Sequence, residues 1–75
     1  MIQVTVGTTT TKVKVLVEES KTPKQVLNDA EVDYSVATVH LDGSVLSAQD
    51  MNTSLADLGC GETALLIAVI KQENA

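Results

Sequence analysis

The sequence predicts a small α+β domain in which a mixed β-sheet carries one helix on one of its faces. Three observations support this fold class. Several segments alternate apolar and polar residues with the period of a strand, one segment has the signals of a helix start, and an apolar, β-branched run comes late in the chain. With 75 residues, the chain is long enough for one hydrophobic core. We expect a single domain over residues 1–71 and a short polar tail over residues 72–75.

The first part of the chain predicts an antiparallel hairpin. Ile2, Val4 and Val6 alternate with polar residues, and a second alternating segment covers residues 12–18. Between the two segments lie a glycine and four consecutive threonines, which favour a turn. In the second segment Leu16 is an apolar exception in the outward-facing row.

Residues 22–25 predict the start of the helix. Thr22 can cap a free backbone N–H group, Pro23 suits the first helical position, and Gln25 completes a capping box. A helix over residues 23–30 then presents one apolar stripe to the sheet. The stripe consists of Val26, Leu27 and Ala30.

Two short strands are expected after the helix. Residues 37–41 alternate apolar and polar side chains, and residues 44–46 form the second segment. Asp42 and Gly43 stand between them. This pair predicts a tight type I′ turn, because both central positions of that turn need positive φ angles.

The region after residue 53 predicts a one-turn helix and then a buried strand. Ser54 can cap a short helix over residues 54–57, and Gly59 is placed to end it in a left-handed conformation. Residues 63–70 are apolar and rich in β-branched side chains, so we expect a strand that is buried on most of both faces. Such a strand belongs in the centre of the sheet, beside the first and third strands.

This order of elements resembles the β-grasp fold, and within it the ubiquitin-like branch with the bacterial sulfur carriers of thiamin and molybdopterin synthesis. The stretches that carry the resemblance are MIQVTV (residues 1–6), VHLDGSVL (39–46) and SLADLGCGETALLIAVI (54–70), in an order that covers nearly the whole chain. The resemblance implies one of two uses. One is covalent or sulfur chemistry at a C-terminal Gly-Gly, and the other is recognition of a protein through an apolar patch on the open face of the sheet.

The last residues depart from the carrier pattern. Gln72 and Glu73 stand where a sulfur carrier would have its glycines, and Asn74 and Ala75 follow them. A reactive tail has to be slim and flexible to enter an enzyme's active site, and side chains obstruct that entry. We therefore expect a non-catalytic protein-binding module. A carrier or modifier that needs C-terminal processing is the alternative.

The expected binding patch lies on the open face of the sheet. If Leu65, Ile67 and Val69 face the core, strand alternation turns the residues between them outward. The predicted patch consists of Leu16, His40, Leu66, Ala68 and Ile70. A contiguous exposed apolar patch usually marks a partner site, so a charge at Ala68 should abolish partner binding without unfolding the domain.

Two alternatives stay open for this surface. The opposite alternation would bury the alanine face and expose Leu65, Ile67 and Val69, which makes a larger patch. The same face, or the short edge strand at residues 45–46, could instead join copies of the chain into a homo-oligomer.

Charge and composition weigh against other partners. Residues 1–24 hold four Lys and two Glu, a balance of +2, whereas residues 25–75 hold one Lys and eight acids, a balance of −7, for a net charge of −5. With no Arg and Tyr34 as the only aromatic residue, the sequence predicts no nucleic-acid partner. The longest apolar run, residues 64–70, falls short of the roughly 20 residues that cross a bilayer, so we expect no membrane contact.

The sequence predicts no catalytic, metal or cofactor site. His40 is the only histidine, and no Ser or Cys is placed in the sequence to act with it as a nucleophile. Cys60 lies between two glycines with no neighbouring cation that would activate its thiol. No Cys or His cluster has metal-ligand spacing. Because a single cysteine forms no internal disulfide and no secretion signal is evident, we expect a cytoplasmic protein that is not an enzyme.

Overall fold

The computed structural model describes residues 1–70, apart from the side chain of Ile70. The elements in chain order are β1 (Ile2–Thr8), β2 (Lys12–Val17), α1 (Pro23–Asp29), β3 (Ala37–Leu41), β4 (Ser44–Val45), α2 (Ala48–Met51) and β5 (Thr63–Ile70). The expected domain boundary at residue 71 and the positions of Gln72 and Glu73 lie outside the described residues. Within residues 1–70, neither helix has the length and apolar character that a bilayer crossing requires.

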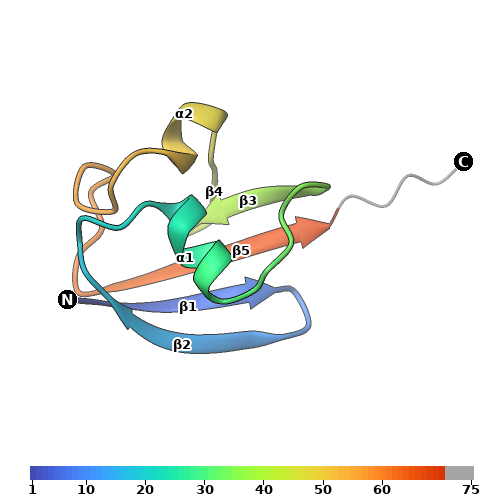
Figure 1. Cartoon of the computed structure of the whole chain (residues 1–75), viewed down its shortest axis with the longest axis horizontal. Helices are drawn as coiled ribbons and strands as arrows, with labels where there is room; N and C mark the ends of the chain where they lie inside the picture. The colour runs from blue at the N-terminus through green and yellow to red at the C-terminus, as the bar shows by residue number, and fades with distance from the viewer. Residues whose placement is uncertain (71–75) are drawn as a thin grey trace, which may run out of the picture.

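The five strands form one mixed sheet in the order β2-β1-β5-β3-β4. β1 and β5 are parallel, and the other neighbours are antiparallel. β5 therefore lies in the centre of the sheet between β1 and β3, as the sequence predicted (Figure 1). The coarse fold class, α+β with a mixed sheet, is confirmed.

The β1–β2 hairpin depends on a glycine at its narrow end. Val4 pairs with Val15, and the turn closes with the Thr8 N–H donating to the Thr11 carbonyl at 2.8 Å. A Cβ on Gly7 would overlap the carbonyl oxygen of Thr11. The two backbones can approach this closely only because residue 7 has no side chain.

The capping box that predicted α1 is present. The Gln25 N–H donates to the Thr22 hydroxyl at 3.2 Å, and the Thr22 N–H donates to the Gln25 side-chain carbonyl at 3.0 Å. α1 buries Pro23, Val26 and Leu27, so the predicted apolar stripe is the face that packs on the sheet. Two donors at the helix start that would otherwise lack partners are satisfied in this way.

The turn between β3 and β4 is the predicted type I′ turn. Asp42 has φ 51° and Gly43 has φ 89°, both in the left-handed region. Asp42 also ties the turn to β5, because its N–H donates to the Leu65 carbonyl at 2.8 Å and its Oδ1 accepts from the Leu65 N–H at 2.9 Å. A side-chain oxygen thus makes the bond that a backbone carbonyl would make in a continuing strand.

The short helix lies earlier than the sequence predicted. Residues 54–57 form a turn, although the Asp57 N–H does donate to the Ser54 hydroxyl at 3.2 Å and Gly59 does have the expected positive φ, 84°. The helix α2 begins after Ser47, whose hydroxyl and backbone N–H form a full capping box with Asp50. Ser47 and Asp50 together satisfy two N–H groups, whereas the cap at Ser54 satisfies one, and this difference favours the earlier helix.

The core fills the space between the sheet and α1. The buried apolar residues are Ile2, Val4, Val6, Val26, Leu27, Val39, Leu41, Leu55, Ala64 and Leu66. Met51 of α2 packs against the same cluster, so both helices lie on one face of the sheet (Figure 1). The opposite face has no covering element among the described residues.

Candidate functional site

The register between β1 and β5 decides which residues of β5 face the helices. Val4 pairs with Ala64 and Val6 with Leu66, and both valines point into the core. Paired residues share a face of the sheet, so Leu66 and Ala68 also lie on the helix side. Each of these two side chains is 0% exposed.

This placement corrects the predicted orientation of β5. The predicted orientation has Leu65, Ile67 and Val69 in the core and Leu66 and Ala68 on the open face. The structure instead buries Leu66 and Ala68. The physical reason is that β5 is the central partner of β1, whose buried valines fix the face of every paired residue. The row of Ala64, Leu66 and Ala68 is the inner row of β5.

The outer row of β5 therefore lies on the open face. This row is Leu65, Ile67 and Val69, the alternative that the sequence left open. Leu65 is 41% exposed and Val69 is half-buried, whereas Ile67 is only 8% exposed. Ile67 pairs with Gly7 on one side and with His40 on the other. Residues of the neighbouring strands therefore shield it, although no element within residues 1–70 lies above it.

Two further apolar side chains belong to the open face. Leu16 of β2 pairs with Gln3, and Val45 of β4 pairs with His40, so both share the face of the outer row. They are 68% and 62% exposed. We name the set Leu16, Val45, Leu65, Ile67 and Val69 the open-face patch.

Polar residues separate and border the open-face patch. Thr5, on β1, pairs with Leu65 on one side and with Lys14 on the other. Lys12 shares the outward row of β2 with Lys14, and its ammonium donates to the Thr9 carbonyl at 2.9 Å. The apolar strip along β5 thus has lysines two strands away on one side, and on the other side His40 and Thr38 on β3.

The five residues predicted for the patch have three different outcomes. Leu16 and His40 lie on the open face, where the sequence analysis put them. Leu66 and Ala68 are buried on the other face. The side chain of Ile70 lies outside the described part of the structure. The five predicted residues do not include Leu65, Ile67, Val69 and Val45, which are on the open face. The first three belong to the alternative alternation of the same strand.

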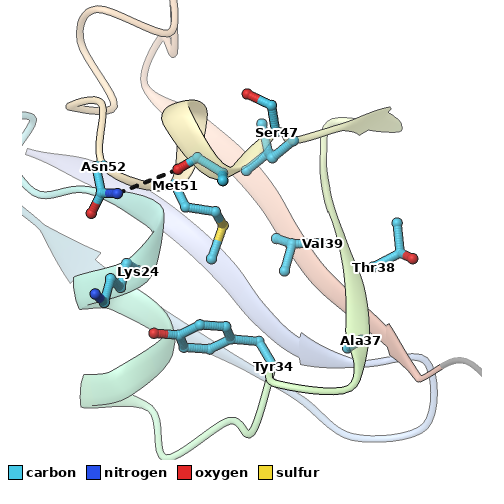
Figure 2. A pocket seen from close by; sticks show the side chains of 10 residues that line it. Lys24, Tyr34, Ala37, Thr38, Val39, Ser47, Met51 and Asn52 are labelled. Carbon is cyan, nitrogen blue, oxygen red and sulfur yellow. Dashed lines mark hydrogen bonds between the residues drawn. The ribbon is translucent and has the colours of Figure 1, made fainter.

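A pocket of about 420 Å³ lies on the helix side, between α1, α2 and β3. In Figure 2 the Met51 side chain points toward the ring of Tyr34, and Thr38 points away from both. Two polar side chains of the pocket, at the two ends of α2, already make hydrogen bonds within the protein. The Asn52 amide donates to the Ala48 carbonyl at 3.3 Å, and the Ser47 hydroxyl accepts from the Asp50 N–H at 3.2 Å. The other polar side chains that line the pocket are those of Lys24, Tyr34 and Thr38.

The Cys60 thiol lies partly buried beside the core. Burial, and secondarily the negative charge of Asp42, raise the pKa of the Cys60 thiol above its ordinary value. The thiolate is the reactive form of cysteine, so this environment disfavours a nucleophilic role. Among residues 1–70, no group of three or more His, Cys, Asp or Glu side chains could hold a metal ion.

The sequence matches no protein-family model. No curated protein matches it either. The geometry of the open face is therefore the basis for assigning a function.

Proposed function

We propose that this chain is a ubiquitin-like β-grasp domain that binds a protein partner non-covalently through the open-face patch. The mixed sheet, the single longer helix on one face and the central position of β5 support the fold. A non-catalytic role agrees with the raised pKa of the Cys60 thiol, which holds the only cysteine in its less reactive form.

The observation that carries the proposal is the outer row of β5. A central strand is the most shielded position in a sheet, yet here its outward side carries Leu65, Ile67 and Val69, and no helix within residues 1–70 lies above them. Leu16 and Val45 extend the apolar surface toward the two edges of the sheet. Burial of such side chains by a partner gains roughly 25 cal/mol per Å² of apolar surface.

The charges around the patch define the partner's chemistry. The described residues near the patch include Lys12 and Lys14 on the β2 flank, with Glu18 beyond Leu16 and Asp42 beside Leu65. A partner that presents apolar side chains, with a carboxylate facing the two lysines, would complement the β2 flank. Charges at the border of an interface act mainly on the association rate, so binding should weaken moderately at high salt.

The test compares two exposed apolar residues in different places. Leu65→Ser removes the centre of the open-face patch, whereas Val36→Ser changes an exposed residue in the connection before β3 (Val36 is 63% exposed). N-terminally tagged protein is incubated with extract of its native host, and the bound proteins are identified by mass spectrometry with and without a denaturing wash. We expect wild type and Val36→Ser to retain the same partner and Leu65→Ser to lose it.

Two outcomes would contradict the proposal. Equal capture by Leu65→Ser and wild type would show that the partner does not use the open face. A partner that stays attached through the denaturing wash would show covalent use of the chain and would favour the carrier alternative. Circular dichroism of Leu65→Ser confirms that the variant is folded before the comparison is made.

A further inference from the structure

The two edges of the sheet differ in length. β4 has two residues, whereas β2 has six and is paired on one side only among the described residues. β2 contains no proline, and each of its residues 12–17 has a single partner on β1. An edge strand of this length is a template for another strand, and natural proteins usually protect such edges by shortening or bending them or by placing charged residues such as Lys on them. In Figure 1 β2 forms the lower border of the molecule.

The hairpin fixes which backbone groups of β2 face outward. The Thr8 N–H donates to the Thr11 carbonyl, so Thr11 directs its backbone groups toward β1. Backbone direction alternates along an antiparallel strand, so residues 13, 15 and 17 also face β1. The N–H and C=O groups of Lys12, Lys14 and Leu16 therefore point away from the sheet.

The side chains of β2 also leave apolar surface at this edge. Val13, on the helix side, is 50% exposed, and Leu16, on the open face, is 68% exposed. Each face of β2 therefore exposes an apolar side chain to solvent, and a sixth strand beside β2 would partly cover both. An added strand has to keep the valine row on the helix side, because a shift of one residue exchanges the two faces.

We propose that β2 pairs antiparallel with β2 of a second copy of this chain, with Val15 facing Val15 across a two-fold axis. In this register Val13 lies opposite Val17 of the second copy and Lys14 lies opposite Leu16. Lys12 lies opposite Glu18, which follows β2 in the same outward row. Five residues of each strand pair, and opposite charges meet at both ends.

Neighbouring registers that keep the same faces are less favourable. A shift of two residues in one direction brings Lys14 opposite Lys14 of the second copy, and like charges directly opposite are destabilising. A shift of two residues in the other direction pairs only residues 14–18, with Leu16 opposite Leu16 of the second copy, and leaves Lys12 and Val13 beyond the paired segment. The sequence of β2 therefore favours one self-complementary register.

The distribution of charge favours a second copy at this edge. Residues 1–24, which contain β2, carry a balance of +2, whereas the remainder of the chain is strongly acidic. Asp42 and Asp50 belong to the β3–β4 turn and to α2, at the side of the sheet opposite β2. Pairing through β2 keeps these acids of the two copies apart, which limits repulsion between chains of net charge −5.

The interface is small, so we expect a weak dimer. Two paired edge strands bury less than the roughly 1,200 Å² that stable complexes reach. The inference concerns the edge of the sheet and does not depend on the proposed use of the open face.

A disulfide test distinguishes the proposed register from random collision. In a Cys60→Ser background, Val15→Cys places two thiols across the two-fold axis at a non-hydrogen-bonded pair, where Cα atoms lie about 4.5 Å apart. The matched control is Val13→Cys, which faces Val17 of the second copy. We expect Val15→Cys to form a disulfide-linked dimer several times faster than Val13→Cys under mild oxidation, although Val13 is the more exposed residue.

A charge exchange tests the same register without cysteine. Lys12→Glu and Glu18→Lys should each weaken the dimer roughly tenfold, because two ion pairs are replaced by two repulsive pairs. The double variant restores opposite charges and should recover the wild-type dissociation constant in sedimentation equilibrium. Both residues are exposed, so these variants should fold like wild type.

Three results would overturn the inference. One is oxidation of Val13→Cys at a rate equal to or above that of Val15→Cys. Another is a monomer mass for the wild type at millimolar concentration. The last is a double variant that associates no better than either single variant.

Discussion

The two rows of β5 differ in burial and in the size of their side chains. The inner row, with small Ala64 and Ala68 on either side of Leu66, is almost fully buried under the helices. The outer row holds Leu65, Ile67 and Val69, which have more apolar surface and no covering element among the described residues. Three of the four large side chains in these two rows, those of Leu65, Ile67 and Val69, thus face away from the core.

The contrast shows that strand pairing, not side-chain size, sets the face of a central strand. Ala64 shares the core cluster with Leu27 and Leu55, whose larger side chains are fully buried. The outer row of β5 leaves part of its apolar surface exposed, which agrees with the proposed role in binding.

A buried charge gives the largest expected difference between the two rows. Ala68→Glu places a carboxylate without a partner in the core. This change should lower the free energy of unfolding by about 3–5 kcal/mol, which is a large part of the total stability of a small domain. Leu65→Glu on the outer row should change stability by less than about 1 kcal/mol. Urea titration followed by circular dichroism measures both. Equal midpoints would contradict the assigned faces, and a folded Ala68→Glu would restore the original prediction for this residue.

Truncation of adjacent leucines gives the next largest difference. Leu66→Ala opens a cavity in the core and should cost about 2–5 kcal/mol, because Leu66 is fully buried. Leu65→Ala removes a side chain that is 41% exposed and should cost about 1 kcal/mol or less. The free energy of unfolding from urea titration checks both values. A larger loss for Leu65→Ala would mean that the open face is covered in the folded protein.

The smallest expected effect is the pH dependence contributed by Cys60, which packs against the core cluster that contains Ala64 and Leu66. The pKa of the folded thiol is raised, so the unfolded thiol ionises first as pH rises. The stability contribution is fully present below the unfolded pKa, about 8.5, and is lost as pH rises through the folded pKa. Urea titrations at neutral and alkaline pH should show a smaller loss for Cys60→Ser than for wild type. An identical loss would mean that the thiol is not buried beside the core.

Local signals predicted local structure well. The Thr22–Gln25 capping box and the Asp42-Gly43 turn are present as expected, because each depends on residues within four positions of one another. The short helix was misplaced because Ser47 and Ser54 both offer a cap, and only Ser47 has a reciprocal partner three residues later.

The candidate site was harder to predict because it depends on long-range pairing. Both rows of β5 are apolar, so its own sequence gives no preference for either face. The choice is made by the register with β1, in which Gln3 meets Thr63. Leu16 and His40 were placed correctly because their strands alternate apolar and polar residues more clearly.

The parallel pairing of β1 with β5 has a consequence for how the chain folds. Gln3 and Thr63 are neighbours in the sheet although they are sixty positions apart in the sequence. The β1–β2 hairpin and α1 can form from nearby residues, but the inner edge of β1 stays unpaired until β5 arrives. Contacts between residues so far apart in the sequence slow folding, because the chain loses the entropy of closing a long loop before these contacts stabilise it. We therefore expect the centre of the sheet, its most buried part when complete, to form last.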